Sequence, residues 1–287
     1  MALRAGFIGL GNIGKPMARR LVAAGLETFV LDALPAPVDE LVREGAKPSS
    51  TPRELAERVD VIGVCVRDDA DVRAVVGGDE GLLAGAARGS VIALHSTILP
   101  STVREVGAAA AERGIGVLDA CVTGGAAAAA AGKLTYMVGG DLAHLERCRP
   151  AFETSAAKIV HTGPLGSGAA TKLCNNLMTY LAWLSAFESF KLARAAGLSQ
   201  EKLEEVTRSN GNLTDPMLAF LALHKAPAET RKSSGVQATL RSFATLAEKD
   251  LAVTLAFARE SGVALPGTGL ASQLMASVYG VEEASRG

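Results

Sequence analysis

A three-glycine motif near the N-terminus constrains this chain more than any other stretch. Arg4–Leu10 is an apolar run that contains Gly9, the first glycine of the motif. Gly9, Gly11 and Gly14 are spaced as G-x-G-x-x-G, and Lys15–Gly25 has a helical pattern. A strand, a glycine turn and a helix, in that order, form the context in which this motif binds a dinucleotide. Gly9 allows the tight turn, Gly11 lets the backbone approach a pyrophosphate, and Gly14 lets the helix pack closely on the strand. The helix N-terminus also attracts phosphate groups.

An acidic residue follows at the distance that such a site requires. The next predicted strand, Glu27–Leu31, ends at Asp32, about 20 residues beyond the glycine loop, where a carboxylate binds the adenosine ribose. No arginine stands beside Asp32 to accept a 2′-phosphate, and the carboxylate would repel one. A glycine turn with an unrelated aspartate is the alternative. Because loop, helix, strand and acid occur together, we predict a site for NAD, with NADP as the alternative cofactor, formed by Gly9, Leu10, Gly11, Asn12, Ile13, Gly14 and Asp32.

Strands and helices continue to alternate as far as residue 163. The predicted strands are Val59–Val66, Val91–Leu94, Gly116–Asp119 and Leu134–Val138. The predicted helices between them are Leu41–Glu44, Thr51–Arg58, Asp71–Val76 and Pro100–Arg113, with Thr51 as N-cap and Pro52 at the first helical position. This alternation predicts an α/β domain of Rossmann type, with a parallel sheet and right-handed crossovers.

Two further cofactor contacts are predicted from the sheet. Ligands bind outside the carboxyl ends of parallel strands, where Val66 and Thr97 stand. A helix-capping hydroxyl is an equally good interpretation of Thr97.

A hydroxyl and two glycines follow the strand at Gly116–Asp119. Thr123, Gly124 and Gly125 offer a side-chain donor and closely approachable backbone N–H groups, which suit a substrate carboxylate. A plain turn is the alternative. The six alanines Ala126–Ala131 are predicted to be helical.

The pattern changes near residue 163, where strands stop and helices follow. We predict two domains: residues 1–163 bind the nucleotide, and residues 164–287 form an all-helical substrate and dimerisation domain. Leu173–Ala196 is apolar on nearly every side, so it should be buried within a domain or between subunits. A helix over Ala169–Ala196 would reach roughly 42 Å, which is long for a lone domain. We therefore expect a homodimer or homotetramer that buries this helix.

The remaining helices of the second domain are predicted from caps and glycine stops. They are Ser199–Arg208, with Ser199 as N-cap, then Pro216–Leu223, Ser242–Ser261 and Thr268–Tyr279. Polar loops are predicted at Asn210–Asp215 and Ala226–Gly235.

The composition excludes several classes of partner. Twenty-nine Lys and Arg against thirty Asp and Glu leave a formal charge of −1, so no basic field favours nucleic acid or an anionic membrane. The sequence has no signal-peptide layout and no apolar run long enough to span a bilayer, so we expect a cytoplasmic protein. The cysteines have no metal-ligand spacing, and we predict no metal site and interpret them as small buried hydrophobic residues: Cys65, Cys121, Cys148 and Cys174.

A lysine and an asparagine stand one helical turn apart in Gly163–Asn176, GPLGSGAATKLCNN. On a helix, the Cβ atoms of Lys172 and Asn176 would lie about 5–6 Å apart on one face. Beside a nucleotide site this arrangement suits proton transfer, although a solvated helix face is the ordinary interpretation of such a pair.

Four motifs in this order resemble the β-hydroxyacid dehydrogenase family, which includes 3-hydroxyisobutyrate and 6-phosphogluconate dehydrogenases. They are FIGLGNIGKPMA at Phe7–Ala18, DACVTGG at Asp119–Gly125, GPLGSGAATKLCNN at Gly163–Asn176 and KDL at Lys249–Leu251. The resemblance covers nearly the whole chain, and it implies a nucleotide-binding domain followed by an all-helical domain with a long interdomain helix.

The resemblance also implies roles for individual residues. Lys172 would be the general acid/base, and Asn176 would orient the substrate. The substrate carboxylate would be held by Thr123, Gly124 and Gly125, while Thr97 and Lys249 would contact the cofactor. Cys121 and Thr123 stand where the family usually has proline and serine, which puts the identity of the substrate in doubt.

We therefore expect an oxidoreductase that transfers hydride between NAD(P) and a small 3-hydroxy acid, similar to 3-hydroxyisobutyrate, or its semialdehyde. No arginine cluster accompanies the motifs, which disfavours a sugar phosphate. The alternatives are an NADPH-dependent glyoxylate or succinic semialdehyde reductase and an imine reductase on the same fold, although imine reductases usually lack the lysine. A dinucleotide-binding sensor or scaffold is the non-enzymatic alternative.

Overall fold

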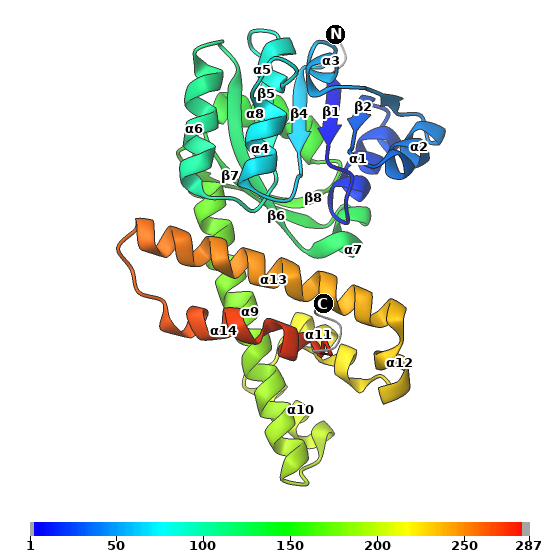
Figure 1. Ribbon diagram of the computed structural model, residues 1–287, viewed down its shortest axis with the longest axis vertical. Coiled ribbons are helices and arrows are strands. Elements are labelled where there is room, and N and C mark those ends of the chain that lie inside the picture. The colour runs from blue at the N-terminus through cyan, green and yellow to red at the C-terminus, as the bar shows by residue number, and fades with distance from the viewer. Residues whose placement is uncertain (1–2, 283–287) are drawn as a thin grey trace. The chain divides into compact units, whose positions relative to one another are not determined.

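The computed structural model describes residues 3–282 and separates into two compact units, Met1–Lys172 and Leu173–Gly287. The first unit is an α/β domain and the second is helical, as predicted (Figure 1). Strand β8 ends at Gly163, close to the residue at which the sequence pattern changes from alternating strands and helices to helices. The long predicted helix is α9, Ser167–Ala195, which begins in the first unit and continues into the second.

An eight-stranded sheet forms the centre of the first unit, in the order β3-β2-β1-β4-β5-β6-β7-β8. The strands are β1 Arg4–Ile8, β2 Glu27–Leu31, β3 Lys47–Pro48, β4 Val61–Val64, β5 Val91–Leu94, β6 Gly116–Thr123, β7 Leu134–Gly139 and β8 Ala156–Gly163. Strands β1 to β6 are parallel to one another, as predicted. The sheet is not parallel throughout, because β7 pairs antiparallel with β6. The short connection between β6 and β7 explains this, since a parallel crossover needs about a dozen or more residues.

Helices cover both faces of this sheet (Figure 1). One face packs against α1 Gly14–Ala23, α2 Pro35–Arg43, α7 Gly125–Ala130 and α8 Leu142–Phe152. The other packs against α3 Pro52–Ala56, α4 Asp69–Val76, α5 Leu82–Gly85 and α6 Pro100–Ala111. Helix α3 begins as predicted, with Pro52 in its first turn and the Thr51 hydroxyl accepting the Glu54 N–H at 3.1 Å. Helix α8 and strand β8 were not predicted.

The second unit contains the rest of α9 and five more helices. They are α10 Gln200–Ser209, α11 Asp215–Lys225, α12 Ala228–Lys232, α13 Ser234–Glu260 and α14 Pro266–Tyr279. Ser199 caps α10 as predicted, since its hydroxyl accepts the Lys202 N–H. The loop predicted at Ala226–Gly235 was wrong, because this stretch contains α12 and the start of α13. Its polar residues include good helix formers, and polarity alone does not distinguish a loop from an exposed helix.

An aromatic cluster fills the core of the second unit. Trp183 stacks on Phe220 at a centroid distance of 5.2 Å and meets Tyr180 and Tyr279 edge-on. Helix α9 is not covered all round within a single chain, since Met178 and Leu192 are each 71% exposed, and its burial between subunits stays a prediction. Cys174 on the same helix is also exposed, whereas Cys121 and Cys148 are buried as predicted.

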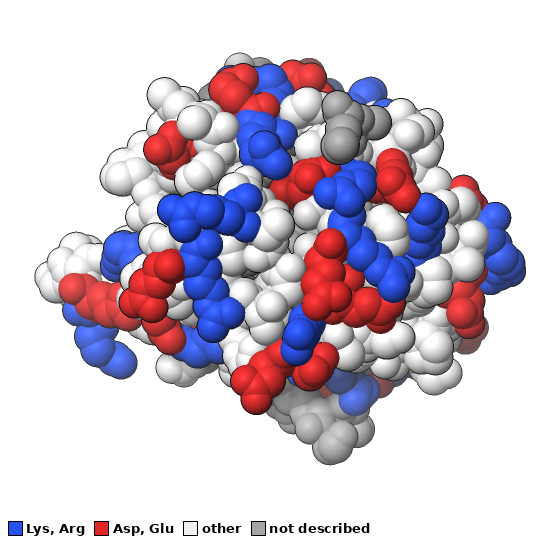
Figure 2. All heavy atoms as spheres, turned by 90° about the horizontal axis from the view of Figure 1, so that it is seen from above, with Lys and Arg blue, Asp and Glu red and all other residues white. Residues whose placement is uncertain are grey.

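Charged side chains of both signs lie beside one another on the face shown in Figure 2. The first unit contains exposed ion pairs such as Arg4–Asp60 at 3.0 Å and Arg73–Glu105 at 2.9 Å. Solvent screens such pairs, so they contribute little to stability. The unit is held together mainly by the two apolar faces of its sheet.

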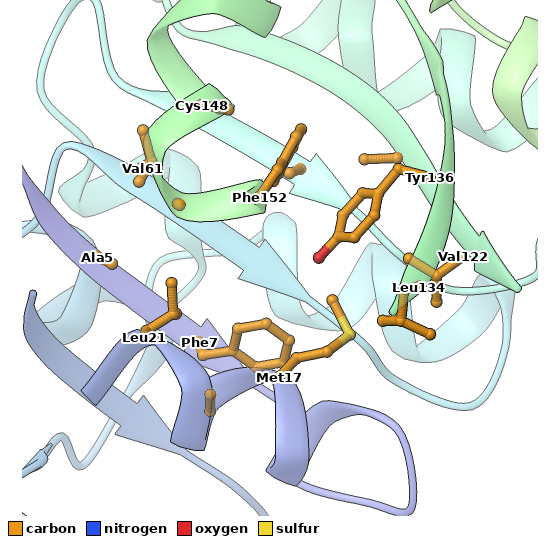
Figure 3. Close-up of a cluster of buried hydrophobic side chains, with 14 of the residues drawn as sticks. Ala5, Phe7, Met17, Leu21, Val61, Val122, Leu134, Tyr136, Cys148 and Phe152 are labelled. Carbon is orange, nitrogen blue, oxygen red and sulfur yellow. The ribbon is translucent and has the colours of Figure 1, made fainter. Parts of the chain in front are cut away.

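A buried histidine lies inside one of these faces. The His95 ring stacks on Phe7 at 5.7 Å and meets Tyr136 and Phe152 at 5.8 Å. Figure 3 shows the side chains of Phe7, Met17, Tyr136 and Phe152 pointing toward one another in this cluster. The His95 Nδ1–H group donates a hydrogen bond to the Ala120 carbonyl oxygen at 2.7 Å. Burial lowers the pKa of His95 to about 4, with the carbonyl contact acting in the opposite direction, so the ring is neutral in the folded protein.

We expect this histidine to make the fold acid-sensitive. In the unfolded chain its pKa returns to about 6.5, so the stability present above that pH is lost as the pH falls from about 6.5 to about 4. A shift of this size corresponds to about 3 kcal/mol. We expect urea unfolding between pH 7 and pH 4.5 to show that the difference in free energy of unfolding between wild type and His95→Gln becomes smaller as the pH falls. His161→Gln, at an exposed position, is the control. A difference in free energy of unfolding that stays constant across this pH range would contradict the expectation.

Candidate active site

The glycine loop connects β1 to α1 at the centre of the sheet. Gly9 has φ of 90°, and a Cβ there would collide with the carbonyl group of Cys65. A Cβ on Gly14 would collide with the Gly9 carbonyl oxygen. These two positions therefore require glycine for reasons internal to the fold, as the sequence predicts.

Gly11 differs from these two glycines. A Cβ there would have no atom of the described chain within 4 Å, so packing does not require glycine at this position. Helix α1 starts beside it without a side-chain cap at Ile13. An open backbone at a helix N-terminus fits the pyrophosphate of a dinucleotide.

Asp32 follows β2 and stabilises the glycine loop by hydrogen bonding. Its Oδ2 accepts the Leu10 N–H at 2.5 Å, and its Oδ1 accepts the Leu34 N–H at 2.8 Å. Each carboxylate oxygen can accept a second hydrogen bond, so the side chain can still bind ribose hydroxyls. Three features therefore fit a dinucleotide: a glycine loop held by Asp32, free space beside the Gly11 backbone, and a carboxylate that can bind ribose.

The strand order reverses between β1 and β4, because β2 and β3 lie on one side of β1 and β4 on the other. Ligands bind at the carboxyl ends of the strands beside such a reversal. Val66 follows β4 there, and Thr97, which is half-buried, follows β5. Ser96 joins their two segments, since its hydroxyl donates to the Val66 carbonyl and accepts the Val66 N–H, both at 2.9 Å. This role of Ser96 was not predicted, because a serine before Thr97 has no distinctive sequence pattern.

The predicted carboxylate cradle lies at the end of β6. Thr123 is the last residue of this strand, and Gly124 and Gly125 have φ of 128° and 76°. Side chains rarely adopt these backbone angles, so the turn into α7 requires both glycines. The turn brings backbone N–H groups to the start of a short helix, beside the half-buried Thr123.

A buried carboxylate on β6 holds the start of α9. Asp119 Oδ1 accepts the Gly166 N–H at 2.9 Å, and Oδ2 accepts the Ala169 N–H at 2.7 Å. Burial raises the pKa of Asp119, and these backbone N–H groups offset part of the rise. Lys172 lies on α9 one turn beyond Ala169, so one carboxylate connects the cradle strand with the helix that carries the lysine. Asp119 was not predicted to have a role, although an acid inside the apolar strand GVLDACV was a usable signal.

Lys172 is half-buried, and Asn176, one turn further along α9, is buried. The Asn176 side-chain amide donates to Asp250 Oδ2 at 2.8 Å. Lys249, a predicted cofactor contact, lies with its Nζ 2.7 Å from Asp250 Oδ1. Asp250, the neighbour of Lys249 in the same motif, was not among the predicted site residues.

No group of three or more His, Cys, Asp or Glu side chains in residues 3–282 is placed to hold a metal ion. Across the same residues, every helix is too short or too polar to span a membrane.

The fold and the glycine loop define a dinucleotide-dependent enzyme of the Rossmann class. Residues 4–163 match the family model for the NAD-binding domain of 6-phosphogluconate dehydrogenase. Residues 166–286 match the model described as NAD-binding of NADP-dependent 3-hydroxyisobutyrate dehydrogenase. The chain belongs to the β-hydroxyacid dehydrogenase family, whose members are NAD(P)-dependent oxidoreductases acting on hydroxyl groups.

Similar proteins cover nearly the whole chain. An NAD-dependent L-serine dehydrogenase from Pseudomonas aeruginosa is 38% identical over 93% of this chain and 89% of its own. A 3-hydroxyisobutyrate dehydrogenase from the same organism is 34% identical over the same shares. A 3-hydroxyisobutyrate dehydrogenase from Mycobacterium tuberculosis, solved with L-serine, covers 100% of both chains at 29% identity and a TM-score of 0.82. An imine reductase from Myxococcus stipitatus, at 21% identity and a TM-score of 0.68, shares the fold alone.

Removing the Asp119 carboxylate should destabilise the start of α9. Asp119→Ala leaves two buried N–H groups without acceptors, and we expect a loss of about 2–5 kcal/mol in the free energy of unfolding. Asp141→Ala is the matched control, because Asp141 caps α8 at an exposed N-terminus and should cost only about 1 kcal/mol. Urea denaturation measures both losses, and equal losses would contradict the role given to Asp119.

Proposed function

We propose that this protein is an NAD-dependent dehydrogenase of a short 3-hydroxy acid, or the reductase of the matching semialdehyde, with Lys172 as its general acid/base. The observation that carries the proposal is the Asp119 carboxylate. It connects the strand that ends in Thr123-Gly124-Gly125 with the helix that presents Lys172 and Asn176.

The relatives support a substrate class for this chain. Their names specify L-serine, 3-hydroxyisobutyrate and 2-(hydroxymethyl)glutarate. All three compounds are carboxylates with a primary hydroxyl group two carbons from the carboxylate. We propose this arrangement as the substrate class of the protein, and the cradle at the end of β6 suits the carboxylate two carbons from the hydroxyl group.

Each site residue then has a proposed task. The Thr123 hydroxyl and the N–H groups of Gly124 and Gly125 hold the carboxylate, Asn176 orients the substrate hydroxyl, and Lys172 takes the hydroxyl proton. When bound, NAD would supply the hydride acceptor for the substrate carbon. The cofactor would be held by the loop Gly9–Gly14 with Asp32, Val66, Thr97 and Lys249.

Assembly and domain roles complete the proposal. We assign nucleotide binding to residues 1–163, and substrate binding and dimerisation to residues 164–287. Exposed Met178 and Leu192 on α9 support a homodimer or homotetramer, because large apolar side chains in water favour association. A cytoplasmic location stays a prediction from the sequence.

We expect a substrate panel to favour NAD and short 3-hydroxy acids. L-serine and 3-hydroxyisobutyrate should reduce NAD with kcat/KM at least about tenfold above the value with NADP, because Asp32 repels a 2′-phosphate. The 6-phosphogluconate reaction should be poor. Formation of reduced cofactor, measured at 340 nm, tests both points and separates an enzyme from a sensor or scaffold. Higher kcat/KM with NADP, or efficient turnover of 6-phosphogluconate, would contradict the assignment.

Replacing Lys172 should remove proton transfer while leaving cofactor binding intact. Lys172→Ala should lower kcat by about 10²–10⁴-fold, the usual contribution of a general acid/base. Lys172→Arg should not restore the rate, because a guanidinium does not give up its proton at working pH. NAD affinity, measured by calorimetry, should change little in either variant.

Lys191→Ala is the matched control, since Lys191 lies on the same helix with an exposed side chain. It should retain the wild-type kcat. If Lys172→Arg kept much of the rate, Lys172 would instead bind the substrate carboxylate by charge alone.

A further inference from the structure

A buried carboxylate of the second unit has no task in the function proposed above. Asp250, on α13, is 4% exposed and lies between α13 and α9. Its neighbours include Asn176 and Tyr180, which are 5% and 7% exposed. A buried carboxylate is costly unless it is paired and hydrogen-bonded, so its partners indicate what it is for.

Both donors from α9 reach the same oxygen. The Asn176 Nδ2 group donates to Asp250 Oδ2 at 2.8 Å, and the Tyr180 hydroxyl donates to it at 3.1 Å. Lys249 Nζ lies 2.7 Å from the other oxygen, Oδ1, and compensates the charge of the carboxylate. The two α9 donors therefore share Oδ2, while the lysine faces Oδ1.

The carboxylate determines which way the Asn176 amide faces. A carboxylate oxygen only accepts hydrogen bonds, so the amide atom beside it must be Nδ2 and not the carbonyl Oδ1. Reversing the amide would place two acceptors against each other inside the unit. Burial, followed by the charge of Asp250, raises the pKa of Tyr180. The phenol therefore keeps its proton and continues to donate to Oδ2.

We propose that Asp250, held by Tyr180, is the positioning residue that fixes the Asn176 amide in one orientation toward the substrate. The amide then presents its carbonyl oxygen and its remaining N–H in a constant arrangement. This inference rests on the proposed role of Asn176 as a substrate contact. Misplacement of an orienting group by about 1 Å can cost about 10²-fold in rate, so the effect should be measurable.

A double-mutant cycle tests the proposal with the best substrate of the panel. Asp250→Ala should lower kcat about 10–100-fold. In an Asn176→Ala background, the same change should lower kcat less than about twofold, because Asp250 acts through the amide. Asp250→Asn should restore part of the rate, since its side-chain oxygen can accept the same two donors.

A second cycle separates this role from an effect on Lys249. In a Lys249→Met background, Asp250→Ala should still lower kcat, because the amide is still released. If the effect disappeared with Lys249→Met and persisted with Asn176→Ala, Asp250 would act through the lysine and the proposal would be wrong.

Thr254→Val is the control for damage to the fold. Thr254 is buried one turn along α13 and donates to the Asp250 main-chain carbonyl at 2.8 Å, on the backbone and not on the carboxylate. We expect reduced stability with unchanged kcat. A fall in kcat equal to that of Asp250→Ala would mean that general loosening explains both.

The outcomes separate this inference from the proposed function. If Asn176→Ala kept the full kcat, the proposed role of Asn176 and this inference would fail, while the proposed reaction would stand. If Asn176→Ala were impaired and Asp250→Ala were not, only the inference would fail.

A readout independent of turnover is the pair of Asn176 side-chain amide protons in NMR spectra of the substrate-free protein. These should exchange slowly with solvent in wild type and rapidly in Asp250→Ala. Slow exchange in both proteins would overturn the proposal.

Discussion

The hydrogen bonds that Asp119 accepts from the start of α9 are the interaction on which the candidate site depends. One carboxylate accepts the N–H groups of Gly166 and Ala169, and it stands on the strand that ends in the predicted carboxylate cradle. The helix start is thereby fixed to β6 at a buried position, where a missing acceptor would be costly. The strand that carries the cradle and the helix that carries the lysine are therefore joined through one side chain.

The sheet itself explains why the cofactor elements lie together. The first six strands are parallel, and the strand order reverses beside β1, so the glycine loop and the segments after β4 and β5 emerge at one edge. Asp32 then holds the loop through the Leu10 N–H, and Ser96 joins the ends of β4 and β5. The fold thus forms the proposed dinucleotide site largely from backbone groups, with few side chains committed to it.

Sequence reasoning succeeded where the signal is local and failed where it is not. The glycine loop, Asp32, the Thr51 and Ser199 caps and the long helix all follow from spacings within one or two elements. Asp119 and Asp250 escaped it because their partners lie 47 and 74 residues away, and no spacing along the chain encodes those contacts. Strand β7 was predicted without its antiparallel direction, which depends on the short connection to β6. The helix inside the predicted polar loop was missed because polar composition does not distinguish a loop from an exposed helix.

The close approach of two backbones at the start of α9 has a consequence for sequence variation. A Cβ on Gly168 would collide with the carbonyl oxygens of Asp119 and Met137, and a Cβ on Gly139 would collide with Ser167 and Gly168. Any side chain at either position must push the helix away from the strands, and Lys172, one turn beyond Gly168, moves with it. In a saturation library selected for turnover, positions 139 and 168 should therefore tolerate substitution as poorly as residues that contact the substrate, although glycine has no side chain that could contact it.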